Sequence, residues 1–526
     1  MRRGEIARSV SRGAFYLAIE KIAALLSGTA YFALLLRWVG PTKYGIMILA
    51  LSFAGLATMV TGNFETYLER FAAEYQARGA MATLRRSQLL ALGLKLLFGL
   101  VAAGLMIALA PWLARQFNTP WLTVLIPLLT PMVAFDGLAT TGRATLYGMQ
   151  RFRAVCVLAV AFHVLKTIMV GLLWLALKGL PELAIGIALL AVVQGVMNTL
   201  VPLWILRGAR DPDGAGQPPG IRSLLRSILR YCLPMMGARA TWLAGQNLGK
   251  VVLGKLVDAA SLGYYSFAFQ TMDRLIDLIY PLPSALLPSL THLVTRQERE
   301  RMGDIFDHAF RLIQVTACVL AVGVFVFARE LTLLVGSPLF EPAVPLLRVM
   351  ALIPIARTAY EPMSMLFQAM HRPGAVLWLA LVKFATEFSG YFVLVPMLGI
   401  LGAGWAGLAG SAVAYFGALA LLARLMPEGS AGRSRTVAVA LAYTGVMCLT
   451  GLALDRSRPF GWSFVARLLL LPPGLLALFA LQLLTGYDMQ KLAALPLRTP
   501  WMSRPRDFVV AWGDRLARTL TPRRAA

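Results

Sequence analysis

Charged residues are scarce in this chain, and their scarcity excludes a soluble protein of this length. Only 14% of the 526 residues are charged, whereas 58% are hydrophobic, and the mean hydropathy is +0.69. So few charges cannot cover the water-facing surfaces that a soluble chain of this size needs. The composition therefore predicts a protein that crosses a membrane many times.

Cysteine and histidine are also rare, and their placement indicates neither disulfides nor a metal site. The chain has four residues of each type. The cysteines show no CxxC spacing and no Cys/His spacing typical of metal ligands. All four lie in or beside apolar segments, where we expect small buried side chains: Cys156, Cys232, Cys318 and Cys448.

Sequence motifs for nucleotide binding and for signal-peptide cleavage are missing. No GxxxxGK[ST] pattern occurs, so ATP-driven transport by this chain alone is not expected. The first apolar run is of full membrane-spanning length and is interrupted by charges. No small-residue cleavage site accompanies it, so we do not interpret it as a cleavable signal peptide.

Long apolar runs are abundant, and they predict an all-α membrane protein. A helix needs roughly 20 apolar residues to cross a bilayer, and about 14 segments have this character. The alternating ten-residue pattern of a membrane barrel does not occur. The predicted spans are 13–36, 44–64, 87–110, 120–141, 154–177, 182–206, 231–254, 262–285, 307–328, 343–366, 375–398, 400–424, 435–454 and 463–484.

Lysine and arginine are distributed unevenly over the connections between these spans. One set of alternate connections, including both termini, holds 31 of them, and the opposite set holds 8. Cytoplasmic connections are enriched in these residues, so both termini are predicted to be cytoplasmic. This topology accounts for most of the net charge of +25, and a nucleic-acid partner is not expected.

The first twelve predicted spans contain an internal repeat of six. At an offset of 218 residues, Arg37 corresponds to Lys255 and Gly45 to Gly263. Further along, "MQRFRAVCVLA" corresponds to "MHRPGAVLWLA" at an offset of 221. A shift of six helices preserves direction through the membrane. The repeat therefore predicts two parallel six-helix lobes, with a site between them near the midplane.

The repeat and the hydrophilic linker between its halves define a predicted domain organisation. The tail is basic, and Phe508, Trp512, Leu516 and Leu520 predict an amphipathic helix that lies on an anionic inner leaflet or docks a partner enzyme. The predicted parts are an N-lobe (1–206), a cytoplasmic linker (207–227), a C-lobe (228–425), two further spans (426–485) and the basic cytoplasmic tail (486–526).

Basic residues inside the predicted spans suggest a substrate site. Each costs on the order of 2.5–3.5 kcal/mol by insertion scales, so a group of them needs a reason. Lys21 and Arg239 are equivalent in the repeat, and Arg239, Gln246 and Lys250 share one helical face. Together with Arg274, these cations predict a cavity that binds phosphate, for which the arginine fork is well suited. The alternative is that the charges only neutralise one another.

Acidic residues in the same spans are candidates for the cavity or for ion coupling. Asp273 and Asp277 lie on one stripe of the eighth span. Glu20, next to Lys21 but about 100° away around the helix, is interpreted as a local balancing or coupling charge. Asp136 corresponds to Arg357 in the repeat, so it is either half of a bridge between lobes or a proton or sodium site.

Other intramembrane charges are interpreted as structural. Arg357 with Glu361, and Lys383 with Glu387, have the i, i+4 spacing of pairs within one helix. Lys95 is expected to find a local partner or to extend towards the interface.

The chain resembles a known family of membrane transporters over residues 1–425. The segment "LLRWVGPTKYGIMILA" is echoed by "VLGKLVDAASLGYYSFA", and "LYGMQRFRAV" by "LFQAMHRPGAV". With twelve plus two spans and a parallel six-helix repeat, it is similar to the polysaccharide-transport (Wzx-type) flippases of the multidrug/oligosaccharidyl-lipid/polysaccharide (MOP) superfamily.

The resemblance implies a flippase in the bacterial cytoplasmic (inner) membrane. Such proteins move undecaprenyl-pyrophosphate-linked oligosaccharides to the outer leaflet by alternating access, for O-antigen, capsule or exopolysaccharide synthesis. Relatives hold the lipid pyrophosphate with cations in spans 1, 7 and 8, where Lys21, Arg239 and Arg274 stand here. No cofactor is implied beyond a coupling proton or sodium ion. A monomer is expected, with a repeat-unit polymerase or glycosyltransferases as partners.

Three alternatives differ in substrate or in class. Fourteen spans also resemble the flippase for lipid II, the peptidoglycan precursor, although the first span here has one lysine where that branch has several arginines. A cation-coupled multidrug extruder would need no cationic cavity, and it usually has twelve spans. A membrane glycosyltransferase or polymerase would need a sizeable outer loop, which this chain lacks, so a transporter rather than an enzyme is predicted.

Overall fold

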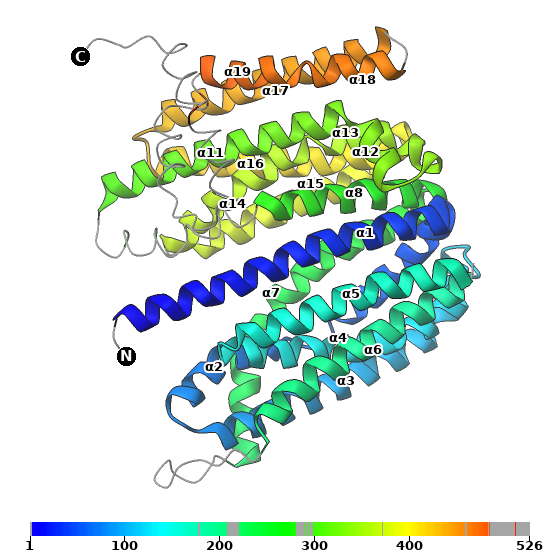
Figure 1. The fold of residues 1–526 in the computed structure, drawn as a ribbon, viewed down its shortest axis with the longest axis vertical. Coiled ribbons are helices and arrows are strands. Elements are labelled where there is room, and N and C mark those ends of the chain that lie inside the picture. Colours follow the sequence, from blue (N-terminus) through cyan, green and yellow to red (C-terminus); the bar gives the residue numbers. More distant parts are fainter. Residues whose placement is uncertain are drawn as a thin grey trace. The chain divides into compact units, whose positions relative to one another are not determined.

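The chain is α-helical throughout the part that its computed structural model describes (Figure 1). The described residues are 3–176, 179–207, 220–279, 298–370, 372–457 and 460–481, with the single residues 290, 294, 483 and 511. These ranges contain one short 3-10 helix and no strand. The all-α class is therefore confirmed, whereas the predicted amphipathic helix of the tail lies outside the described residues.

The helices follow the order of the predicted spans. The first are α1 (Arg3–Ala57), α2 (Glu65–Ala77), α3 (Met81–Gln116), α4 (Leu122–Gly148), α5 (Phe152–Ala176), α6 (Leu180–Ile205), α7 (Ile221–Leu256) and α8 (Ala259–Ile279). The later ones are α11 (Arg299–Val326), α12 (Ala328–Val335), the 3-10 helix η1 (Pro338–Ala343), α13 (Val344–Met350), α14 (Ile353–Ala369), α15 (Pro373–Leu398), α16 (Ile400–Leu425), α17 (Ser430–Ser457), α18 (Phe460–Leu468) and α19 (Leu471–Ala480).

Every predicted span coincides with at least one of these helices. By length and hydropathy, nine helices among the described residues can cross a membrane, or ten if a bent pair is counted as one span. The bent pair joins Pro338–Met350 to Ile353–Ala369 at an angle of 42°. A multi-pass membrane protein is thus established, and the number of 14 stays a prediction.

The two first predicted spans are the arms of α1, which turns sharply at Gly40. Gly40 has φ 71° and ψ 171°, a conformation open almost only to glycine. The rings of Phe32 and Tyr44 lie 6.3 Å apart between centroids. Along a straight helix, twelve residues rise about 18 Å, so the second arm must fold back on the first. Pro41, whose φ suits the first turn of a helix, starts that second arm.

The corresponding turn of the second repeat, between α7 and α8, uses a different start signal. The carboxylate of Asp258 accepts hydrogen bonds from the N–H groups of Ala260 and Ser261, at 3.0 and 3.2 Å, and from the Ser261 hydroxyl at 2.6 Å. Burial by itself raises the pKa of Asp258, but these hydrogen bonds outweigh it and lower the pKa below its usual value. An aspartate cap thus replaces the Gly-Pro turn of α1.

The helices cluster into two compact units. Unit 1 comprises Met1–Ser266 with Leu333–Glu341, and unit 2 comprises Phe267–Thr332 with Pro342–Ala526. Helix α7, assigned by the repeat to the second lobe, therefore packs with the first six spans. Residues 208–219 of the predicted linker lie outside the described residues, and its last part is helical because α7 begins at Ile221. The predicted lobe boundaries themselves stay a prediction.

Unit 1 has a buried ion pair at its core. The Lys95 ammonium lies 2.7 Å from the Glu65 carboxylate and donates to the Gly62 carbonyl, also at 2.7 Å. Both side chains are less than a tenth exposed. A Cβ at Gly137 would lie 3.1 Å from Cδ of Lys95, so this glycine makes room for the lysine stem. The expected local partner of Lys95 is confirmed.

In unit 2, a buried arginine joins the last helices to the rest. Arg467 of α18 is fully buried, and its guanidinium lies 2.5 Å from the Glu330 carboxylate and 3.5 Å from that of Asp455. It also donates to the Val326 carbonyl at 2.9 Å, and Asp455 pairs with Arg348 at 2.6 Å. In Figure 1, α17 lies along α11 in accordance with their contacts. This network connects α11, α12 and α13 with α17 and α18.

We predict that Arg467→Leu destabilises the protein strongly, because it leaves two carboxylates without their buried partner. Breaking such a pair costs about 3–5 kcal/mol. The apparent melting temperature of the purified protein in detergent should fall by several degrees. The exposed Arg435 on α17 provides the control, since Arg435→Leu should leave that temperature nearly unchanged. Equal melting temperatures for the two variants would contradict this role of Arg467.

Candidate functional site

In unit 1, the carboxylate of Glu20 is held by an arginine from another helix. Glu20 is only 4% exposed, and the guanidinium of Arg143 on α4 donates a hydrogen bond to it. Arg143 also lies over the ring of Tyr147, 5.3 Å from its centroid, and donates to the Tyr147 hydroxyl at 3.2 Å. Glu20 is thus a balanced charge, which agrees with the first of its two sequence interpretations.

Lys21, the neighbour of Glu20, lies in a different environment. Its side chain is exposed, whereas that of Glu20 is buried, as the 100° between adjacent helical residues requires. Within the described part of the chain, the Lys21 ammonium makes no hydrogen bond or ion pair. A cation without a protein partner is what an anionic substrate needs.

Among the described side chains of unit 1, no other predicted site residue makes a hydrogen bond or ion pair with Lys21. The Arg239 side chain on α7 lies outside the described residues. Lys250, further along α7, and Asp136 on α4 are half-buried. The equivalence of Lys21 and Arg239 therefore stays a prediction from the repeat.

In unit 2, Asp273 of α8 pairs with Arg357 of α14 at 2.6 Å, and each side chain is about one-third exposed. This pair corrects the expected pairing of Arg357 with Glu361 on the same helix. The helices bring Asp273 closer to the guanidinium, and an ion pair between two helices also joins them.

Two further charges of the predicted spans in unit 2, Lys383 and Glu387, lie on α15. No ion pair within 4.0 Å joins Lys383 to Glu387 among the described residues, and Glu387 accepts a hydrogen bond from the Tyr391 hydroxyl at 2.6 Å. Of the other predicted site residues, Arg274 is half-buried and Asp277 is exposed, both on α8.

The role of Arg143 does not follow from the sequence, because the predicted span 120–141 ends before this residue. Helix α4 continues to Gly148, so Arg143 lies inside the helix and one turn before Tyr147. The signal that could have revealed it is the run "TTGRATLYG", in which one glycine, but no proline, asparagine or aspartate, precedes the arginine.

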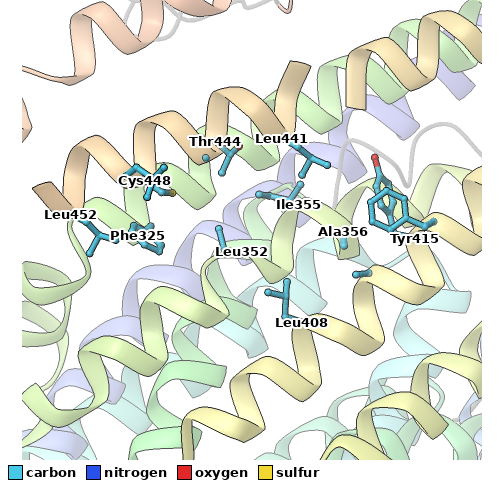
Figure 2. Close-up of a pocket in the computed structure, with 14 residues that line it drawn as sticks. Phe325, Leu352, Ile355, Ala356, Leu408, Tyr415, Leu441, Thr444, Cys448 and Leu452 are labelled. Carbon is cyan, nitrogen blue, oxygen red and sulfur yellow. The ribbon is translucent and has the colours of Figure 1, made fainter. Parts of the chain in front are cut away.

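An apolar pocket of about 440 Å³ opens in unit 2 between α11, α14, α16 and α17 (Figure 2). For scale, an engineered apolar cavity of about 150 Å³ holds benzene. Its rim reaches the protein surface, because Phe416, Leu441 and Leu449 are 51%, 40% and 68% exposed. In a membrane protein such a rim faces lipid chains.

The polar groups in this pocket are already satisfied by the protein. The Tyr415 hydroxyl donates to Oε1 of Gln314 at 2.8 Å, and the Thr444 hydroxyl donates to the Ala440 carbonyl at 2.8 Å. Cys448 is free and buried, as are the other three cysteines, which confirms their expected role. Since these hydroxyl hydrogens are engaged, the pocket suits an apolar occupant and not a hydrated one.

We predict that Asp273 and Arg357 are energetically coupled. Asp273→Asn and Arg357→Met should each lower the apparent melting temperature, whereas the double variant should lose less than the sum. A coupling energy of about 1 kcal/mol is expected for a partly exposed pair. Asp277→Asn with Arg357→Met is the matched control, and strict additivity in both cycles would show that the pair contributes nothing.

One protein-family model, described as polysaccharide biosynthesis protein, matches residues 10–294, a little over half of the chain. Among curated proteins, stage V sporulation protein B of Bacillus subtilis (strain 168) is 23% identical over 441 residues. The aligned region covers 79% of this chain and 84% of that protein.

Two solved structures show the same fold. One is titled lipid II flippase MurJ in an inward closed conformation: its TM-score is 0.62 at 13% identity, over 89% of this chain and 97% of that chain. The other is an inward-facing conformation of a multidrug resistance MATE family transporter of the MOP superfamily. Its TM-score is 0.61 at 15% identity, over 81% and 99% of the two chains. The predicted MOP fold is confirmed.

Proposed function

Because this chain belongs to the polysaccharide biosynthesis protein family and has the MOP transporter fold, we propose that it is a flippase for lipid-linked oligosaccharides. The substrate class is a repeat unit attached through pyrophosphate to undecaprenol. The protein moves it from the inner to the outer leaflet of the bacterial cytoplasmic membrane by alternating access, for O-antigen, capsule or exopolysaccharide synthesis.

The apolar pocket of unit 2 is the observation that carries this proposal. A lipid-linked substrate has a long hydrocarbon chain that must stay in an apolar environment while its polar head crosses the membrane. The pocket offers an apolar wall with a lipid-facing rim, next to α17, which lies beyond the internal repeat. A transporter of small water-soluble cargo has no use for such a wall.

Lys21 supplies the complementary polar feature. A pyrophosphate carries several negative charges, and each needs a cation or a hydrogen-bond donor as it leaves water. The Lys21 ammonium is exposed on unit 1 and has no protein partner among the described residues, whereas its neighbour Glu20 is already paired with Arg143. We assign pyrophosphate binding to Lys21, with Arg239, Arg274 and Lys250 as further donors.

The proposal extends to orientation and coupling. The lysine and arginine bias supports cytoplasmic termini, and three exposed arginines at the start of α7, Arg222, Arg226 and Arg230, fit the same orientation. A proton or sodium gradient drives the cycle, with Asp136 or Asp277 as the coupling carboxylate. The protein acts as a monomer beside the polymerase or glycosyltransferases of the same glycan.

We predict that Lys21→Ala and Arg239→Ala each reduce export of the lipid-linked unit by at least tenfold. Losing one charge-assisted contact with phosphate weakens binding by about 1.5–3 kcal/mol. The measurement is surface polysaccharide in a deletion strain, together with lipid-linked units that accumulate on the cytoplasmic face. Lys21→Arg should retain much of the activity. Normal polymer from both alanine variants, at normal protein levels, would refute the pyrophosphate site.

We also predict that filling the apolar pocket impairs export without unfolding the protein. Ala412 lines the pocket and is partly buried on α16, so Ala412→Phe should occupy part of the volume. Export should fall several-fold while the melting temperature changes little. Val413→Phe, at the exposed neighbouring position on α16, is the control and should export normally. Equal export by both variants would show that the pocket does not hold the lipid chain.

A lipid II flippase is the second candidate, and the likeness to MurJ together with the two helices beyond the repeat favours it. Both substrates share the undecaprenyl-pyrophosphate chemistry, so a cation that binds pyrophosphate does not by itself separate them. Complementation does: rescue of a strain depleted of its lipid II flippase would support this candidate, whereas rescue of polysaccharide export alone would support the first. Drug resistance without either rescue would indicate an extruder.

A further inference from the structure

Two turns of the chain, far apart in sequence, are equivalent in the internal repeat. The segment "FNTPWL" follows the end of α3, and "VGSPLF" ends α12 and enters η1, at the same offset of 218 residues that relates Arg37 to Lys255. In both, a small polar residue precedes proline. Both segments belong to unit 1, as do Arg37 and Lys255, since residues 333–341 cluster with it.

Each of the two equivalent basic residues is bound to the turn of the other repeat. The Arg37 guanidinium, from the end of the first arm of α1, donates to the Leu334 carbonyl at 2.8 Å and to the Gly336 carbonyl at 3.1 Å. The Lys255 ammonium, at the end of α7, donates to the Gln116 carbonyl. Gln116 is the repeat equivalent of Leu334, so the two contacts are exchanged across the repeats.

The acceptors are suited to cations for a physical reason. Gln116 is the last residue of α3, and Leu334 lies in the last turn of α12. The last carbonyls of a helix have no partner within it, and they form the negative end of the helix dipole. Arg37 and Lys255 therefore donate to helix-end carbonyl groups that have no hydrogen-bond donor within α12 and α3, respectively.

The backbones of the two repeats also approach each other closely, and each repeat supplies one glycine and one carbonyl group. A Cβ at Gly45 would lie 1.8 Å from the Ala259 carbonyl oxygen, and one at Gly263 would lie 2.1 Å from that of Pro41. Gly45 is equivalent to Gly263, and Pro41 to Ala259, in the repeat. Only glycine permits this approach, because any side chain would overlap a carbonyl oxygen.

An aromatic contact completes this end of unit 1. The ring of Phe340 lies between those of Tyr44 and Tyr264, with centroid distances of 6.2 and 6.1 Å. Tyr44 belongs to the second arm of α1 and Tyr264 to α8, so the ring of the later turn contacts a helix from each repeat. The whole arrangement stands at the end predicted to face outward.

We propose that Arg37 and Lys255 form a double latch, which closes this end of the protein around the Gly45 and Gly263 contact and releases when the transporter opens outward. Both cations are exposed, so water can replace their carbonyl partners at little cost, as a reversible contact requires. Glycine backbones can separate without exposing large apolar side chains. The equivalence of the two contacts means that both must release together.

The test measures accessibility of the closed end in purified protein in nanodiscs without substrate. Leu262 is 1% exposed and lies beside Gly45 and Lys255. A Leu262→Cys variant should react slowly with a hydrophilic maleimide while the latch is shut. The parent chain gives the background, because its four cysteines are buried.

Releasing the latch should raise the labelling rate. In the Leu262→Cys background, we expect Arg37→Gln and Lys255→Gln each to raise it by about fivefold, which corresponds to one lost hydrogen-bonding group. Gly45→Ala should raise it further. Arg115→Gln removes an exposed cation beside Gln116 for which the described structure shows no ion pair, so it should have no effect. Gly104→Ala, where a Cβ would meet nothing within 4 Å, is the control for the glycine.

Two results would overturn the proposal. If the Arg37→Gln, Lys255→Gln double variant labels no faster than Leu262→Cys alone, these two contacts do not keep the end closed. Equal acceleration by the Arg115→Gln control would show a general charge effect. The proposal relies on transport by alternate opening but not on the cargo. Faster labelling of the latch variants, together with no polysaccharide export by the unmodified parent chain, would support the latch and reject the proposed substrate.

Discussion

The need to pair charges inside a membrane-spanning helix bundle governs this structure. Lys95 is buried against Glu65, and Glu20 against Arg143. Each pair holds two helices together because an ion without a partner costs several kcal/mol in an apolar environment. Against this background Lys21 is conspicuous, since its ammonium is exposed and has no protein partner among the described residues. A charge that the fold does not neutralise is the natural place for an anionic substrate.

The internal repeat places two equivalent turns at one end of unit 1. Where the chain turns back on itself, the first copy uses Gly40 and Pro41, and the second uses the aspartate cap of Asp258. Different local chemistry thus produces the same turn. The repeats meet there through Gly45 and Gly263, and such exchanged contacts are self-complementary. A closed end that depends on exposed hydrogen bonds and glycine backbones would open at modest cost, as the proposed alternating access requires.

The last described helices, α17 to α19, follow the predicted twelve-span repeat. Arg467 fastens α18 to unit 2 from a fully buried position, and α17 forms one wall of the apolar pocket. The same ionic network therefore fixes the helices that would shelter a lipid chain. A cation for the head group and an apolar wall for the tail are the two requirements of a lipid-linked substrate, which is why the flippase proposal accounts for both.

Sequence alone determined the all-α class, the helix positions and the repeat, because membrane spans depend on the composition of one segment at a time. It also separated Glu20 from Lys21, since helical geometry is local. Only the tertiary structure decided which charges meet. Arg357 pairs with Asp273 and not with Glu361, because spacing along a helix reports shared faces, whereas a partner on another helix depends on packing. The exchanged contacts of Arg37 and Lys255 likewise required the assembled helices, although the repeat had already marked these residues as equivalent.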